Sequence, residues 1–213
     1  MNTRFPFLHT ESSEKVWDTV LMQTRTFVVV PTLGSLLPGW ILVLPKKHCF
    51  ALSELSNSEL SELNELSNTL VNLLSSHFDS RVVGWENGAT SAGQAIGCGV
   101  DHAHLHLVPI NVELRSGAEN LLGRSLRWQH TKDITSLGTL RDGPSYLFVR
   151  ETNGEYFTAT DPNPPSQLLR KVVAQHIGHP ELYDWHSYSG ESHARSTVTR
   201  LLASSDLRAS VIA

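Results

Sequence analysis

A long amphipathic segment, SELSNSELSELNELSNTLVNLLSSHF at residues 53–78, constrains the fold of this chain more than any other feature. Leucines recur along it every three or four residues, which is the spacing of one face of an α-helix. The apolar positions are Leu60, Leu63, Leu66 or Ser67, Leu70 and Leu74. Ser56 and Glu59 form a capping box that predicts the start of the helix. We therefore expect an amphipathic helix of about four to five turns with one buried face.

Apolar, β-branched runs lie on both sides of this helix. TFVVVP (26–31) and WILVLP (40–45) precede it, joined by a stretch whose Gly and Pro content suits a hairpin. RVVGWE (81–86) follows it, and a further strand is expected at residues 102–107. Two strands, a long helix and two more strands favour an α+β fold, with a central antiparallel sheet and helices mainly on one face. A further helix is predicted at residues 13–22.

The second half of the chain has a weaker pattern. SYLFVRE and EYFTATD predict a hairpin that turns at residues 152–154, and DPNPP at 161–165 interrupts the chain. SQLLRKVVAQHIG has the apolar spacing of a helix that ends at Gly178, and residues 191–202 predict a final helix. We therefore expect a core at residues 1–110 and a C-terminal extension at 111–213 that packs on it.

The amino-acid composition predicts where in the cell the protein is found and which classes of partner it does not bind. A chain of 213 residues that is 40% hydrophobic has enough apolar side chains for a substantial core. Its net charge of −4 gives no general attraction to nucleic-acid polymers. Cys49 and Cys98 form neither a disulfide framework nor a CxxC pair, and the start of the sequence has no apolar signal region. Because no run of 18 apolar residues occurs either, we expect a cytoplasmic protein without membrane contact.

GVDHAHLHL at residues 99–107 places histidines at three alternate positions. Side chains alternate between the two faces of a strand, so His102, His104 and His106 are expected to share one face. Three interpretations of this row are open. The histidines are surface or hydrogen-bonded core residues, or two of them bind a metal ion with a third ligand from elsewhere. In the third, a neutral imidazole attacks an electrophilic phosphorus while its neighbours fix its tautomer.

Glycines before the strand bear on this choice. Gly93, Gly97 and Gly99 let backbone N–H groups approach closely and cradle an anion. A metal site gains nothing from such a cradle, because metal ions need electron-pair donors. The glycines therefore favour the interpretation in which the histidine row acts on a phosphate group.

The stretch HAHLHLV resembles the His-φ-His-φ-His-φ-φ signature of the histidine triad superfamily of nucleotide hydrolases and transferases, where φ is apolar. LLPGWILVLPKKH at residues 36–48 is similar to the family's strand that ends in Pro-Lys-Lys/Arg-His, and the helix follows where the family's helix does. The resemblance covers residues 13–110. The later stretch SQLLRKVVAQHIGHPELYDW is similar to the C-terminal region of a longer bacterial branch.

The resemblance implies a nucleotide hydrolase with a histidine triad-like fold. The middle histidine, His104, attacks the α-phosphate of a nucleotide anhydride, ester or phosphoramidate, such as a dinucleoside polyphosphate, and water then hydrolyses the nucleotidyl-histidine. His102 and His106 match the flanking members that orient the nucleophile, and Asn87 matches a position whose amide lies near the phosphates. Branches that are transferases or phosphorylases commonly have Gln at the position of His106. The family requires no cofactor, its partner is a small nucleotide, and a homodimer is expected.

Differences from the family surround the substrate. Thr32 stands where a ribose-binding Asn or Asp is common, and Trp40 stands where some members have a phosphate-contacting His. The connector before the triad is longer than in compact members. The residues expected around the substrate are Asn87, Gly97, Cys98, Gly99, Thr32 and Trp40. These differences also leave open a nucleotide sensor that binds its ligand without turnover.

Other side chains near the expected cleft have structural interpretations. His48 ends a predicted strand and is expected to make hydrogen bonds there. Trp40 and Trp85 suit core packing better than base stacking. The cations of the late helices are interpreted as a charged outer face, the alternative being that they reach a phosphate-rich leaving group. These cations are Arg170, Lys171, Arg195 and Arg200.

Overall fold

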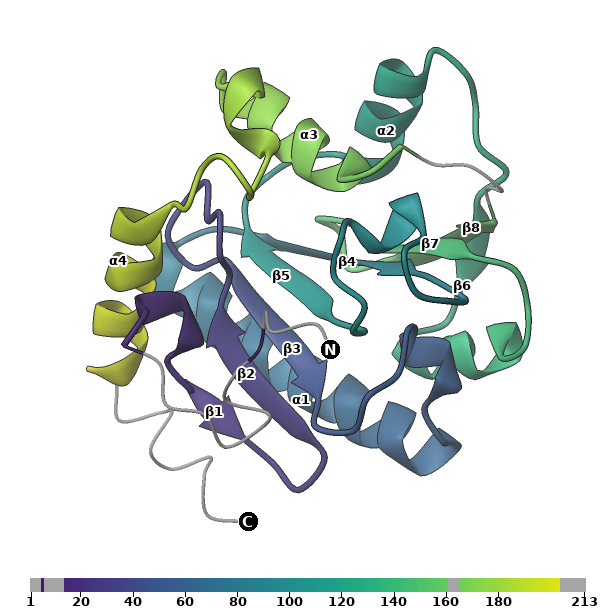
Figure 1. Cartoon of the computed structure of the whole chain (residues 1–213), viewed down its shortest axis with the longest axis horizontal. Helices are drawn as coiled ribbons and strands as arrows, with labels where there is room; N and C mark the ends of the chain where they lie inside the picture. Colours follow the sequence, from purple (N-terminus) through teal and green to yellow (C-terminus); the bar gives the residue numbers. More distant parts are fainter. Residues whose placement is uncertain (1–4, 6–13, 161–164, 204–213) are drawn as a thin grey trace.

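The structure, a computed structural model, describes residues 5, 14–160 and 165–203. Its centre is an eight-stranded sheet in the order β1-β2-β3-β5-β4-β7-β8-β6, in which every neighbouring pair is antiparallel (Figure 1). In sheet order the strands are β1 (Met22–Gln23), β2 (Phe27–Pro31), β3 (Ile41–Pro45), β5 (Leu105–Pro109), β4 (Val82–Gly88), β7 (Tyr146–Arg150), β8 (Tyr156–Thr160) and β6 (Gln129–Thr131). The predicted α+β class is therefore confirmed.

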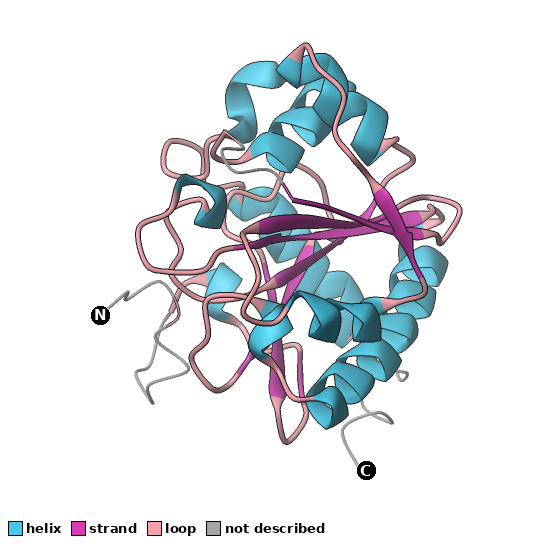
Figure 2. Cartoon of the chain, turned by 90° about the vertical axis from the view of Figure 1, so that its right-hand side faces the viewer, coloured by secondary structure: helices cyan, strands magenta, loops and turns pink. Residues whose placement is uncertain are grey.

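Helices lie on both sides of this sheet, as the edge-on view of Figure 2 shows. The longest, α1 (Asn57–Phe78), covers one face, and its predicted apolar positions are all buried there. Ser56 caps it by accepting from the Glu59 N–H, as the capping box predicts. The shorter α2 (Leu114–Leu122) and α3 (Leu168–His176) pack on the opposite face. The last helix, α4 (Glu191–Leu202), begins and ends where the sequence predicts and packs against β2 and the first 3-10 helix.

Five short 3-10 helices complete the described structure: η2 (Val16–Asp18), η3 (Leu52–Glu54), η4 (Ala95–Gly97), η5 (Ile134–Leu140) and η6 (Pro180–Tyr183). The predicted helix at residues 13–22 is wrong. Residue 13 lies outside the described residues, and the rest forms η2 followed by the edge strand β1. The Leu21 N–H donates to the Val29 carbonyl at 2.9 Å, so this segment adds to the sheet instead of coiling.

The C-terminal part of the chain continues the sheet of the first part. The predicted hairpin forms β7 and β8, and β7 pairs with β4 through partners such as Trp85 and Val149. Most of the predicted DPNPP interruption, residues 161–164, lies outside the described residues. Because α3 and the segment after it return over the sheet, residues from the extension lie against the loop between β2 and β3 and the connector that precedes β5 (Figure 1).

The two faces of β5 divide between the two cores. Leu105 and Leu107 pack with α1, whereas Val108 packs on the opposite face with α2 and α3. His106 lies between Leu105 and Leu107 and therefore points toward the side covered by the extension. Among the helices of the described ranges, none is long and apolar enough to cross a membrane.

Candidate active site

Strand β5 begins later than the sequence predicts, at Leu105, so His102 and His104 precede it. The antiparallel ladder with β3 ends at the pair Val43 and Leu105, and Pro45, two residues further along β3, has no N–H to donate. The Pro45 carbonyl instead lies 2.9 Å from Nε2 of His102. The backbone just before β5 is thus held by side-chain and loop contacts.

The three histidines occupy different environments. His104 and His106 line one cavity, and their ring centroids are 4.8 Å apart. His102 is buried beside that cavity, and its ring lies 5.5 Å from the ring of His48. The Nε2 atom of His48 is 2.7 Å from the Asp101 carbonyl, the kind of bond expected for this residue. Two of the three predicted triad side chains therefore face the same space.

Hydrogen bonds fix the tautomers of the rings that line the cavity. Nδ1 of His104 lies 2.8 Å from the His102 carbonyl, and a carbonyl only accepts, so Nδ1 carries the proton. The lone pair of the neutral His104 ring is then on Nε2. Nδ1 of His106 lies 3.0 Å from the indole Nε1 of Trp40, which only donates. His106 therefore holds its proton on Nε2, where it is a hydrogen-bond donor.

His106 is an uncharged residue in a largely apolar setting. The Trp85 ring stacks on it at a centroid distance of 4.6 Å, and both indoles are fully buried. Burial holds the pKa of His106 well below its usual value, and the neighbouring His104 and Arg170 lower it further. The ring consequently stays neutral at physiological pH, where it can donate through Nε2–H but does not act as an imidazolium acid.

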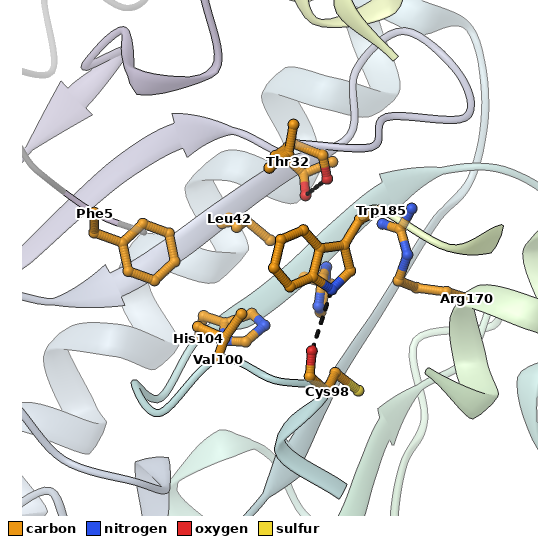
Figure 3. Close-up of a pocket in the computed structure, with 10 residues that line it drawn as sticks. Phe5, Thr32, Leu42, Cys98, Val100, His104, Arg170 and Trp185 are labelled. Carbon is orange, nitrogen blue, oxygen red and sulfur yellow. Dashed lines mark hydrogen bonds between the residues drawn. The ribbon is translucent and has the colours of Figure 1, made fainter. Parts of the chain in front are cut away.

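The cavity is small, with a volume of about 30 Å³, and it is partly open to solvent (Figure 3). Its walls combine apolar side chains with few polar ones. The lining residues are Phe5, Thr32, Leu33, Leu42, Cys98, Val100, His104, His106, Arg170 and Trp185. A lone pair on His104, a donor on His106 and a guanidinium thus converge on a space with otherwise mostly apolar walls.

The Gly-rich connector forms one wall of the cavity, through Cys98. The backbone N–H groups of Gly97 and Cys98 donate to Gln94 and Ala95 within the turn of η4, so the predicted cradle does not have these two donors available. Gly99 has a φ of +78°, a conformation that glycine adopts without strain. The turn is therefore a wall whose amides at Gly97 and Cys98 are already engaged.

Asn87 and Cys98 are joined at the base of this wall. The Asn87 amide donates to Sγ of Cys98 at 3.5 Å, and the Gln167 N–H donates to the same sulfur at 3.1 Å. Burial raises the pKa of the Cys98 thiol, so the thiol stays neutral and Cys98 is a packing residue. Asn87 does not line the cavity and acts on it through this sulfur.

Thr32 and Trp40 are the other two residues expected around the substrate, and only Thr32 lines the cavity. Thr32 lines the cavity and is buried, and its hydroxyl donates to the Leu33 carbonyl at 3.1 Å. Trp40 does not line the cavity, since its indole is enclosed behind His106. Core packing is thus its main role, as its size suggests, with the hydrogen bond to His106 as its link to the site.

Two cavity residues come from the extension. Arg170 of α3 is interpreted from the sequence as part of an outer face, but its side chain is buried and turned toward the cavity. On a helical projection it borders the apolar arc of Leu169 and Val173, which is the sequence signal for its burial. Trp185 carries no such signal. Its indole N–H donates to the Cys98 carbonyl at 3.2 Å, 87 positions earlier in the chain.

The fold and the cavity define an α+β protein whose histidine-lined site lies on the face of the sheet opposite α1. Residues 13–112 match the family model of the HIT domain. This part of the chain, slightly less than half of it, is therefore similar to the HIT domain family. None of the curated proteins compared with it is significantly similar.

Solved structures include similar chains. A HIT-like protein of Bartonella henselae, described as involved in cell-cycle regulation, is 14% identical with a TM-score of 0.40, over 51% of this chain and 78% of that one. A hypothetical histidine triad nucleotide-binding protein of Sulfolobus tokodaii is 21% identical with a TM-score of 0.36, over 42% and 58%. A protein of Streptococcus mutans UA159 is also 21% identical, with a TM-score of 0.37 over 67% and 83%.

Proposed function

We propose that this protein is a nucleotide hydrolase that acts through a covalent nucleotidyl-histidine on His104. The substrate class is a nucleoside phosphoanhydride, phosphoester or phosphoramidate, for example a dinucleoside polyphosphate. The observation that carries the proposal is the bond from Nδ1–H of His104 to the His102 carbonyl, because it puts the lone pair on Nε2 of a residue that lines the cavity. A neutral imidazole with a fixed tautomer is a ready nucleophile.

The reaction has two steps. Nε2 of His104 attacks the α-phosphorus, so a P–N bond forms as the bond to the leaving group breaks, and the leaving group keeps that electron pair. Water then attacks the same phosphorus as the P–N bond breaks, and His104 keeps the electron pair of that bond on Nε2. The water gives up a proton to solvent, and the nucleoside monophosphate and neutral His104 are released. Negative charge develops on the phosphate oxygens in both steps, and Nε2–H of His106 is a fixed donor that can stabilise it.

The proposal predicts a covalent adduct that mass spectrometry detects. Wild-type protein is incubated with adenosine 5′-phosphoramidate and with a dinucleoside polyphosphate, quenched within the first turnovers, digested and analysed. We expect an added nucleoside monophosphate on His104 in wild type and none in His104→Ala. An adduct on another residue, or full turnover by the alanine variant, would contradict the mechanism. A parallel sample with a chelator keeps its adduct if the attack needs no metal ion.

Two alternatives within the superfamily remain as proposals that the same experiment separates. A transferase or phosphorylase forms the adduct but passes the nucleotidyl group to phosphate or a sugar phosphate faster than to water. A sensor binds nucleotides and forms no adduct. His106 in place of the Gln that transferase branches commonly have favours water as the acceptor.

The metal-site alternative has less support from the geometry. Nε2 of His102 donates to the Pro45 carbonyl, and Nδ1 of His106 accepts from Trp40, so both atoms are already engaged. In the described ranges, no group of three or more His, Cys, Asp or Glu side chains is arranged to hold an ion. The chelator arm of the trapping experiment bears directly on this alternative.

We also propose a cytoplasmic homodimer, as the family resemblance implies. Light scattering coupled to size exclusion is expected to give twice the 23.6 kDa mass of one chain. A single-chain mass at micromolar concentration would contradict the dimer but would leave the chemistry on His104 unaffected.

A further inference from the structure

Arg170 is a buried cation in the wall of the cavity. Arg170 is 3% exposed, and within the described ranges no carboxylate lies at ion-pair distance from its guanidinium. Its hydrogen-bond partners are the carbonyls of Gly34 at 2.6 Å and Tyr183 at 2.8 Å, and its guanidinium lies 4.7 Å from the Trp40 ring centroid. Asp184 acts on the guanidinium electrostatically without reaching ion-pair distance. A buried charge without a direct ion pair is costly, so such a position favours a bound anion.

The guanidinium retains donors that no described residue uses. Arginine has five N–H groups in a planar fork, and the two carbonyl bonds use Nε and one proton of Nη2. Nη1 has no acceptor among the described residues. Because Arg170 lines the same cavity as His104 and His106, these remaining donors are available to a ligand there (Figure 3).

The neighbouring loop holds this arginine in place. Gly34 has a φ of +75°, and a Cβ at this position would come within 2.8 Å of Nη2 of Arg170 and 2.6 Å of Cβ of Trp185. The loop between β2 and β3 therefore fits directly onto the two extension residues. A donor fixed in this way does not have to reorganise when charge develops on a ligand.

We propose that Arg170 binds the phosphate that leaves when His104 attacks, so that the extension directs the site toward anhydrides and away from phosphoramidates. This inference rests on the proposed function. As Nε2 of His104 bonds to phosphorus, the P–O bond to the leaving phosphate breaks and its electron pair stays on that oxygen. The guanidinium compensates this charge through Nη1–H, preferably with two parallel hydrogen bonds.

An amine leaving group needs a proton, whereas a phosphate leaving group needs a positive charge beside it. The nitrogen of a phosphoramidate must gain a proton as its bond to phosphorus breaks, and that proton comes from solvent, because a guanidinium does not supply one. His106 does not supply it as an imidazolium either, because burial, His104 and Arg170 keep its pKa well below the usual value. Burial lowers the pKa of Arg170 itself only to about 10, so it stays cationic at neutral pH.

Two substrates that leave the same adduct on His104 test this role. ADP releases phosphate and adenosine 5′-phosphoramidate releases ammonia, whereas the second step is identical for both. For Arg170→Gln we expect kcat/KM to fall about 10²-fold on ADP and by less than about threefold on the phosphoramidate. The ratio of the two values does not depend on the fraction of folded enzyme, so a partly unfolded variant still gives an answer.

Matched variants complete the experiment. Arg195→Gln removes an exposed arginine that pairs with Glu191, and it should leave both substrates unchanged. Arg170→Lys keeps the charge but loses the fork, so an intermediate loss on ADP is expected. An equal loss on both substrates, or no loss on either, would overturn the leaving-group role while adduct formation in wild type still supports the proposed function.

Titration calorimetry with pyrophosphate measures the affinity of the site for an anion without any turnover. We expect binding in wild type and Arg195→Gln and at least about tenfold weaker binding in Arg170→Gln. Unchanged pyrophosphate affinity in Arg170→Gln would overturn the anion site. If wild type forms no adduct with either substrate, the proposed function and the leaving-group role both fail, and the titration then reports separately on whether Arg170 binds phosphate.

Discussion

Replacement of His104 by glycine is expected to lower kcat by roughly 10⁴-fold or more, because it removes the atom that bonds to phosphorus in the proposed mechanism. The fold should persist, since His104 is only partly buried and its ring lies against the cavity. Imidazole added to the solution should enter the vacated space, attack the substrate and restore part of the leaving-group release. The product of that reaction, free nucleotidyl-imidazole, is detectable by chromatography.

The control for this rescue is His179→Gly, which removes an exposed imidazole at the start of η6. We expect wild-type kcat for this variant and no stimulation by imidazole. Activity of His104→Gly within tenfold of wild type would remove His104 from the chemistry. Loss of activity without rescue and without nucleotidyl-imidazole would point instead to a role in substrate binding.

Local patterns in the sequence are sufficient to predict the central elements. Leucine spacing and the Ser56 capping box predict α1, because both act within a few turns of one helix. Apolar and β-branched runs predict β2, β3 and β4 for a similar reason. Alternation in the histidine segment correctly separates the buried Leu105 and Leu107 from the cavity-lining His104 and His106. These features depend on residues close together in the chain.

Elements that depend on distant residues are not predictable in this way. The sequence of α2 contains Gly117 and has no capping side chain at its start, so it carries little helical signal. Its first N–H groups, on Leu114 and Arg115, are instead satisfied by the buried carboxylate of Glu151, at 3.0 and 2.9 Å. Glu151 is 36 or more positions away in the sequence, directly after β7. A nonlocal cap of this kind leaves no local pattern.

The difference between local and distant contacts also explains which residues of the site could be predicted from the sequence. The alternating histidines predict that His104 and His106 share a face, and both line the cavity although β5 begins only at Leu105. Arg170 and Trp185 reach the cavity only because the extension folds back on the loops around Gly34 and Cys98. The spacing of residues along the chain contains no information about that approach, and a charged residue in a helix is usually solvated.

Two tryptophans around His106 allow the contribution of its tautomer to be isolated. Both indoles are fully buried and both touch the His106 ring, but they differ in one hydrogen bond. Nε1 of Trp40 donates to Nδ1 of His106, whereas Nε1 of Trp85 has no partner in the described part of the chain. The change of either tryptophan to phenylalanine removes similar ring volume. Phenylalanine keeps an aromatic face for the Arg170 guanidinium, which lies 4.7 Å from the Trp40 ring centroid. The difference between the two variants therefore reports mainly on the bond to His106.

For Trp40→Phe we expect a loss of roughly 10² in kcat/KM and a cost of about 1–3 kcal/mol in the free energy of unfolding beyond that of Trp85→Phe. Without the indole donor, Nδ1 of His106 is an unsatisfied buried acceptor, and the ring gains by moving its proton there. Nε2 would then present a lone pair to the phosphate and repel it. Steady-state kinetics and urea unfolding of both variants check this, with nitrogen NMR of the His106 ring to observe the tautomer. Equal losses for the two variants would mean that the indoles act through packing alone, and that the donor on His106 is not what stabilises the transferred phosphate.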